Sequence, residues 1–158
     1  MKINIRPATP GDAEAIIQLG LEFDDYLRSI GDNNPTSFDA ATYLKDGFGE
    51  DPAFSGLAAE TNGEVIGYLL YHPGYNIDRG GRVLHVIDLF VTDKARSKGI
   101  GQALMEEAAE ICRKAGGAEL VWEVFLKNKL AMSFYEKLGA KYLQQKDMKN
   151  MYWKIEEK

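Results

Sequence analysis

Residues 87–104 read IDLFVTDKARSKGIGQAL, and this stretch decides the fold because an apolar strand passes through a basic turn into a helix. The turn contains Gly99 and Gly101, whose lack of a side chain lets the backbone approach a ligand closely. The first turn of the helix that follows has unpaired N–H groups and the positive end of the helix dipole. The stretch therefore predicts a site that holds phosphate groups.

Two common phosphate-binding motifs do not fit this turn. A dinucleotide-binding turn needs a third glycine, and the position where it would fall is Leu104. A P-loop needs a Gly-Lys-Ser/Thr ending after four intervening residues, and the stretch has none. The remaining pattern is Arg-x-x-Gly-x-Gly, which begins at Arg96 and ends at Gly101.

This pattern resembles the pyrophosphate-binding motif of the GNAT superfamily of acyl-CoA-dependent N-acyltransferases. Residues 121–140 (VWEVFLKNKLAMSFYEKLGA) resemble a second signature of that family, with Asn-x-x-Ala from Asn128 and Phe-Tyr-x-x-x-Gly-Ala from Phe134. Residues 60–71 (ETNGEVIGYLLY) resemble the hairpin before its acyl-CoA strand. The resemblance spans nearly the whole chain. It implies an α/β fold with a central mixed sheet, splayed central strands and helices on both faces.

Apolar periodicity predicts the order of elements along the chain. We expect a strand at residues 3–6, a helix from Thr9-Pro10 to about residue 30, a second helix at 39–48, and strands at 54–60 and 65–71 that are joined by a tight Asn62-Gly63 turn. Residues 72–81 then read as a long polar loop and 83–91 as a buried strand. A helix to Ala115, a strand at 120–125, a short helix ended by Gly139 and two closing strands at 142–143 and 151–155 complete the prediction.

Length and charge restrict the class of protein. A chain of 158 residues is expected to form one domain, residues 1–158. A net charge of −5 argues against a nucleic-acid partner. The N-terminal sequence has no apolar signal region and the chain no apolar run of about 18 residues, so we expect a cytoplasmic protein with no membrane partner.

The few cysteine and histidine residues predict neither a disulfide nor a metal site. Cys112 is the only cysteine, and its position in the middle of a helix favours a small packed side chain. His72 and His85 lie thirteen residues apart, with no partners at metal-ligand spacing. We therefore assign no metal.

The resemblance implies acetyl-CoA as co-substrate. In that family the turn wraps the pyrophosphate through backbone N–H groups, basic side chains add charge, and a free strand edge pairs with pantetheine while one N–H polarises the thioester carbonyl. Asn128 matches a pantetheine contact, and capping of the next helix is an equal alternative for it. The expected acetyl-CoA-binding residues are Leu89, Phe90, Val91, Arg96, Ser97, Lys98, Gly99, Ile100, Gly101, Gln102, Asn128 and Ala131.

Tyr135 matches the position of a tyrosine that, in many relatives, protonates the departing thiolate. A phenol with an ordinary pKa near 10 is protonated at neutral pH and can give its proton to a thiolate. Plain packing in the apolar stripe of Ala131, Phe134 and Leu138 is the alternative. Cys112 lacks an evident reason for a lowered pKa, so we expect direct attack by the amine rather than an acyl-enzyme.

Residues 54–140 look closest to the di- and polyamine acetyltransferases of the spermidine/spermine type. That group usually has a Glu-Asp pair before its Leu-Phe-Val, whereas this chain has Ile87-Asp88. The departure removes one carboxylate that would contact the amine or position water. The candidates for an amine pocket are Asp24, Asp25, Asp88 and Glu123.

These observations predict an N-acetyltransferase that acts on a primary amine of a small molecule, such as a diamine, a polyamine or a lysine-like amino acid. Acetylation of a protein N-terminus or lysine is a second possibility. A third is a module that senses acyl-CoA without turning it over. The resemblance also allows a homodimer.

Overall fold

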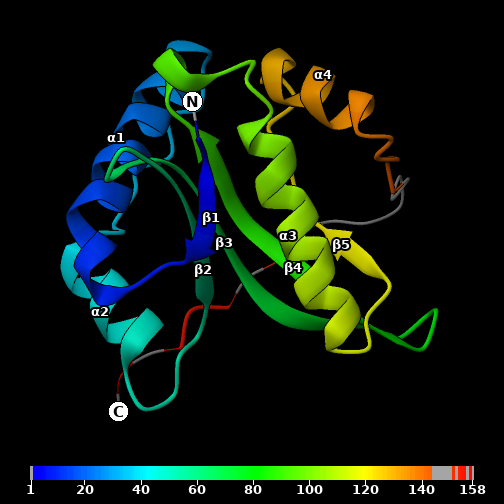
Figure 1. The fold of residues 1–158 in the computed structure, drawn as a ribbon. Helices are drawn as coiled ribbons and strands as arrows, with labels where there is room; N and C mark the ends of the chain where they lie inside the picture. Colours follow the sequence, from blue (N-terminus) through cyan, green and yellow to red (C-terminus); the bar gives the residue numbers. More distant parts are fainter. Residues whose placement is uncertain (1, 144–150, 152, 156, 158) are drawn as a thin grey trace.

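The structure is a computed structural model that describes residues 2–143, 151, 153–155 and 157. In the part of the chain that the structure describes, five strands form one sheet in the order β1-β2-β3-β4-β5 (Figure 1). Among the strand pairs within these described residues, only β4–β5 is parallel. The strands are β1 (Asn4–Pro7), β2 (Ser55–Thr61), β3 (Glu64–Asn76), β4 (Gly81–Val91) and β5 (Glu119–Val121), and the helices are α1 (Ala13–Ser29), α2 (Ala40–Phe48), α3 (Ile100–Lys114) and α4 (Lys129–Lys137).

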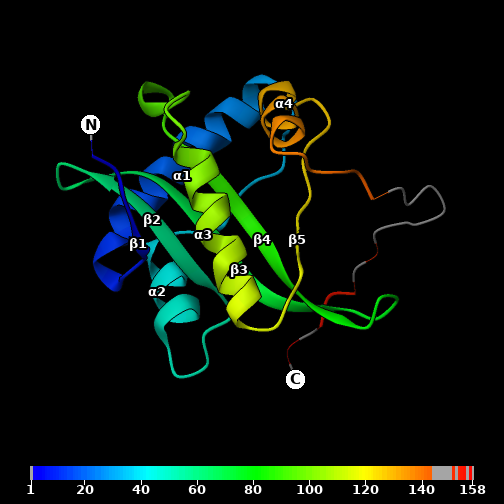
Figure 2. The same ribbon diagram turned by 45° about the vertical axis from the view of Figure 1, so that its right-hand side comes forward.

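The helices cover both faces of the sheet, as the sequence predicts. Helix α3 lies on one face, and α1 and α2 lie on the other (Figures 1 and 2). The alternation of side chains along each strand divides the core into two clusters. Leu69 and Val86 pack with Leu104 on the α3 face, whereas Tyr68 and Phe90 pack on the face covered by α1 and α2.

The turn between β2 and β3 confirms its prediction. Asn62 and Gly63 have φ angles of +50° and +77°, the left-handed values that a two-residue hairpin turn requires. The paired residues Thr61 and Glu64 flank this turn directly. The start of α2 also agrees, because the side chain of Asp39 accepts a hydrogen bond from Thr42 N–H at 2.8 Å and caps the helix.

The predicted loop at residues 72–81 is wrong, because β3 and β4 continue as a long hairpin through most of it. Asn76 pairs with Gly81, which leaves only residues 77–80 in the turn. Pro73 suggests a loop because it has no N–H group. It fits within β3 because β2 begins only at Ser55, opposite Tyr71. At Pro73, β3 therefore has no β2 residue beside it and is an edge strand.

Strands β4 and β5 pair over only three residues, 83–85 with 119–121. The strand expected at 120–125 is therefore shorter than predicted, and β4 extends beyond the pairing to Val91. The two closing strands are not seen where the structure describes the chain: Tyr142, Leu143, Met151, Trp153 and Ile155 lie in irregular backbone, and Tyr152 is outside the described residues.

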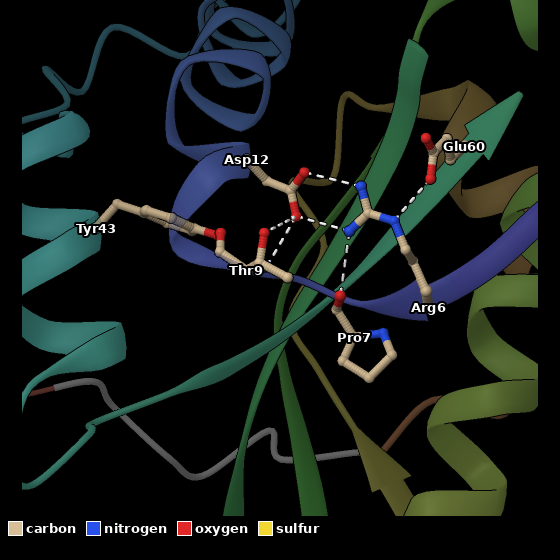
Figure 3. A network of polar contacts seen from close by, with 6 residues as sticks. All are labelled: Arg6, Pro7, Thr9, Asp12, Tyr43 and Glu60. Carbon is tan, nitrogen blue, oxygen red and sulfur yellow. Dashed lines mark hydrogen bonds and ion pairs between the residues drawn. The ribbon is translucent and has the colours of Figure 1, made fainter. Parts of the chain in front are cut away.

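A polar network fastens the N-terminal strand to its neighbours (Figure 3). The guanidinium of Arg6 donates to both carboxylate oxygens of Asp12 at 2.8 and 2.9 Å and to Glu60 at 2.7 Å. These hydrogen bonds from Arg6 hold the pKa of Asp12 below its ordinary value. The hydroxyl of Tyr43 donates to Thr9 C=O at 2.8 Å, which joins α2 to the same corner.

Candidate active site

A cavity of about 770 Å³ opens where β4 and β5 diverge. Its walls come from four parts of the chain: the C-terminal half of β4, the start of α3, the segment after β5, and α4, with Phe23, Tyr26 and Leu27 of α1 closing one side. The cavity therefore brings together both sequence signatures, which lie about 30 residues apart in the chain.

One edge of β4 faces this cavity with backbone groups that pair with no strand beyond His85, and of these Val91 C=O accepts a hydrogen bond from Arg96 at 3.2 Å. Thr92 N–H donates to Ile66 C=O at 2.9 Å and so points toward β3. The N–H and C=O groups of successive residues in an antiparallel strand point to opposite edges. The backbone groups of Phe90 therefore also point toward β3, and those of Leu89 and Val91 point toward the cavity. Of the three residues predicted to pair with pantetheine, two therefore offer their main chain. Phe90 instead stacks on Phe23 with ring centroids 4.9 Å apart.

The start of α3 forms a cradle of N–H groups. Ser97 and Gly99 have φ angles of +62° and +80°, and such left-handed residues turn neighbouring N–H groups toward a common point. The first backbone bond of the helix runs from Ala103 N–H to Gly99 C=O, so the amides of residues 100–102 have no intrahelical acceptor. Ile100 is 2% exposed and contributes only its main chain.

The polar side chains of the turn differ in their surroundings. The guanidinium of Arg96 donates to Val91 C=O at 3.2 Å and to Asp93 at 3.3 Å. It also lies over the ring of Tyr26, 5.7 Å from the centroid, so a fixed positive charge lines the cavity. Lys98 is exposed and does not line the cavity. The amide of Gln102 donates to Glu106 at 2.9 Å.

Asn128 caps α4, which is one of the two roles expected of it. Its side-chain oxygen accepts from Ala131 N–H at 3.1 Å and from the hydroxyl of Tyr26 at 3.3 Å. The side chain is buried, and both Asn128 and Ala131 line the cavity.

Tyr135 lines the cavity from α4 and packs against Trp122 with ring centroids 4.9 Å apart. Burial, together with the negative charge of Asp88, raises the pKa of Tyr135 to about 12. The phenol is therefore protonated at every physiological pH. Packing and a catalytic proton are compatible here, because the ring packs in the stripe while the residue also borders the cavity.

Asp88 is the half-buried carboxylate of the cavity wall. Its Oδ2 accepts a hydrogen bond of 2.6 Å from the hydroxyl of Tyr68. Burial raises the pKa of Asp88 to about 6; the bond from Tyr68 opposes this rise, and the charge of Asp24 adds to it. A carboxylate with that pKa suits proton transfer near neutral pH.

The other predicted amine-binding carboxylates are not equivalent. Asp24 is half-buried on α1 and is not among the residues that line the cavity; burial raises its pKa. The side chain of Asp25 is 80% exposed and pairs with Arg28, away from the cavity. Glu123 lines the cavity at its open side, where its side chain is 82% exposed.

The sequence did not predict a chain of polar contacts that links Glu123 to His85 and His72. His85 contacts Glu123 through Nε2 at 2.8 Å and His72 through Nδ1 at 2.9 Å. His72 in turn contacts Pro73 C=O at 2.9 Å, which fixes its Nδ1 as a donor. The pairing of His72 with His85 across β3 and β4 brings them together. Recognising the long hairpin in the sequence would have revealed it.

Residues 21–140 match the acetyltransferase (GNAT) family. This chain belongs to the GNAT family. A thialysine N-epsilon-acetyltransferase of Bos taurus is 34% identical over 149 residues, which cover 89% of this chain and 85% of the relative. Spermidine/spermine N(1)-acetyltransferase-like protein 1 of Homo sapiens is 27% identical over 86% of this chain and 20% of that protein.

Solved structures give the same result for the fold of this GNAT protein. An integron cassette protein from the mobile metagenome of V. cholerae superposes with a TM-score of 0.75 at 26% identity, over 99% of this chain and 93% of that one. An aminoglycoside acetyltransferase from an uncultured soil metagenomic sample, solved with sisomicin, has a TM-score of 0.72 at 17% identity, over 98% and 97% of the two chains. The predicted family and fold are confirmed.

As a GNAT acetyltransferase, this chain uses acetyl-CoA, and the cavity fits that co-substrate on its own geometry. The N–H cradle of α3 matches a diphosphate, and the free edge of β4 matches the two amides of a pantetheine arm. Within the described ranges, no group of three His, Cys, Asp or Glu side chains is placed to hold a metal ion. No helix among the described residues is long and apolar enough to cross a membrane.

Proposed function

We propose that this GNAT protein moves an acetyl group from acetyl-CoA to a primary amine of a small molecule that carries a second cationic group, such as a diamine, a polyamine or a lysine-like amino acid. The observation that supports this most is the meeting of a free strand edge, a helix N-terminus, Tyr135 and Asp88 in one cavity. The thialysine and spermidine/spermine acetyltransferases among the relatives above support a small amine acceptor.

In this proposal, residues 97–102 hold the diphosphate through main-chain N–H groups, and Arg96 adds a fixed charge beside them. The backbone of Leu89 and Val91 pairs with the pantetheine arm like an added strand. Acetyl-CoA supplies the acyl group as a thioester. An N–H on the cavity edge of β4 polarises the thioester carbonyl.

Asp88 is the residue that receives the amine. An alkylamine is mostly an ammonium ion at neutral pH and must lose a proton before it attacks. With a pKa of about 6, Asp88 is ionised at pH 7 and can bind the ammonium group and accept its proton, directly or through water. Asp24 adds negative charge next to this point.

Tyr135 supplies the proton for the leaving thiolate. The negative charge of Asp88 contributes to its raised pKa, so protonation of Asp88 by the amine lowers the pKa of Tyr135 again. The phenol therefore becomes a stronger acid at the stage when the thiolate leaves. The ammonium group gives one proton to Asp88 before attack, and Asp88 later releases it to solvent. The nitrogen loses a second proton as the amide forms, and water carries this proton to the Tyr135 phenolate, whose own proton has gone to the leaving thiolate.

Glu123 is proposed to contact the second cationic group of the acceptor. It borders the same cavity as Asp88, and its exposed side chain contacts His85 at 2.8 Å. Two carboxylates in one cavity favour a substrate with two positive charges over one with a single charge.

The experiment is thiol release from acetyl-CoA with a panel of acceptors: thialysine, lysine, ornithine, putrescine and spermidine, compared with butylamine and with short peptides. We expect at least one doubly cationic acceptor to exceed butylamine by about tenfold or more in kcat/KM. Preference for the peptides would support a protein acetyltransferase instead. Saturable acetyl-CoA binding without thiol release for any acceptor would support a sensor.

A further inference from the structure

Tyr68 is the buried group in direct contact with the proposed amine site that the reaction above does not use. It lies on β3, is 2% exposed, and packs in the cluster covered by α1 and α2. Its hydroxyl reaches Asp88 of the neighbouring strand at 2.6 Å. Tyr68 pairs with Phe90, so Asp88 is its diagonal neighbour, a distance that a tyrosine side chain spans.

We propose that Tyr68 is the positioning residue of this site: its hydroxyl holds Oδ2 of Asp88, so that the rest of the carboxylate faces the amine in one orientation and in the ionised form. This inference rests on the proposed role of Asp88. A 2.6 Å bond to a carboxylate is in the range of strong, charge-assisted hydrogen bonds.

The hydrogen bond has a fixed direction. Burial and the charge of Asp88 raise the pKa of Tyr68 well above its ordinary value, so the phenol is always the donor and the carboxylate the acceptor. Protonation of Asp88 removes the charge that makes this bond strong. Tyr68 therefore favours the ionised carboxylate and helps Asp88 to release the proton it has taken from the amine.

Other ionisable groups around Asp88 act differently. Asp24 on α1 repels the ionised carboxylate, and Tyr135 on α4 is itself affected by that charge. Glu123, beyond β5, lines the same cavity and pairs with His85. Tyr68 is the side chain whose hydrogen bond opposes the effect of burial on the pKa of Asp88, and the backbone of Leu89 acts in the same direction to a smaller extent. Removing the Tyr68 hydroxyl should leave burial and Asp24 opposed only by the smaller contribution of the Leu89 backbone.

The fold offers a matched control in Tyr43. This residue belongs to the same apolar cluster, is 0% exposed, and donates its hydroxyl proton to Thr9 C=O at 2.8 Å. Tyr68→Phe and Tyr43→Phe therefore each remove one buried hydroxyl with a single acceptor. Only Tyr68→Phe removes a contact to the cavity.

The experiment compares the pH profile of kcat/KM for the wild type, Tyr68→Phe and Tyr43→Phe, and the carbon-13 titration of the Asp88 carboxyl group in each. We expect Tyr68→Phe to move the acid limb and the titration upward by about one pH unit, with rates at pH 9 within a few-fold of wild type. Tyr43→Phe should move neither. In the wild type, the NMR chemical shift of the Tyr68 ring should change with pH in step with the titration of Asp88. In Asp88→Asn, that change should be absent.

Three results would separate failure of this inference from failure of the proposed function. An inactive Asp88→Asn variant together with an unshifted acid limb in Tyr68→Phe would overturn the role of Tyr68 alone. So would equal shifts in both tyrosine variants. A fully active Asp88→Asn variant would overturn the role of Asp88, and the positioning role of Tyr68 with it.

Discussion

Asp88 lies where a negative charge is unfavourable for folding and useful for amine binding. Burial and the charge of Asp24 both act against its ionised form. Active sites often contain such groups, because a cost in stability is retained where it supplies the right pKa. Stability and activity should therefore respond in opposite directions when this charge is removed.

Asp88→Asn is expected to abolish most activity and to stabilise the fold above pH 6. The folded pKa of about 6 is higher than the unfolded value near 3.9, so the folded state loses stability as pH rises through that window. The variant avoids this loss and should gain on the order of 1–3 kcal/mol in unfolding free energy at pH 8, with little change at pH 4. Denaturant unfolding at both pH values measures it. Equal effects at the two pH values would contradict the assignment.

Wild-type kcat/KM should fall as pH drops below about 6, because Asp88 then becomes protonated. The profile should be measured with acetyl-CoA saturating, so that it reports on the amine site. A rate that is flat from pH 7 to 5 would show that no group with this pKa is needed.

Tyr135→Phe tests the proton for the leaving thiolate. The ring and its packing on Trp122 are preserved, whereas the phenolic proton is lost. Turnover should fall about a hundredfold or more, and acetyl-CoA affinity should remain near that of wild type. Steady-state kinetics with calorimetry of acetyl-CoA binding separates the two quantities. Unchanged turnover would leave Tyr135 with a packing role only.

At the scale of elements, the start of α3 is the part whose sequence and function are most tightly linked. Gly99 has a φ of +80°, and a methyl group there would meet no atom within 4 Å. Alanine at this position therefore strains the backbone without a clash. The strain, about 1–2 kcal/mol, should turn the N–H groups of the cradle away from a common point.

Gly99→Ala should weaken acetyl-CoA binding about tenfold or more in Kd. Gly80→Ala is the control, because Gly80 also has a positive φ, +64°, with no atom within 4 Å, and lies in the β3–β4 turn outside the cavity lining. Both variants should lose similar stability, and only the first should lose affinity by calorimetry. Equal affinity in the two variants would show that the turn does not hold the diphosphate.

Elements with a strong local signal could be predicted from the sequence, and pairings that depend on distant strands could not. Asn62-Gly63 specifies a two-residue turn by itself, and Asp39 specifies a helix start. Pro73 by itself indicates a loop. It is acceptable within β3 because β2 does not extend beyond Ser55, which pairs with Tyr71. The contact of His72 with His85 was missed for the same reason.

At the scale of the whole molecule, the divergence of β4 from β5 creates the site. Pairing stops after His85 and Val121, and the backbone groups beyond that point become available to a ligand. The sequence predicted the residues of the turn and of α4 because two motifs carry them. It did not predict that the backbone groups of Phe90 point toward β3 or that Tyr68 contacts Asp88, since both depend on strand register. Nor did it predict that Asp25 lies outside the cavity, which depends on the rotation of α1 about its axis.

The most direct test of the account is amide chemical-shift mapping of the labelled protein during titration with acetyl-CoA. We predict saturable shifts that are largest at the N–H groups of residues 97–102 and at Leu89 and Val91, with small shifts at Phe90. Shifts confined to other surfaces, or no saturable shifts at all, would contradict the claim that the cavity between β4 and β5 binds acetyl-CoA.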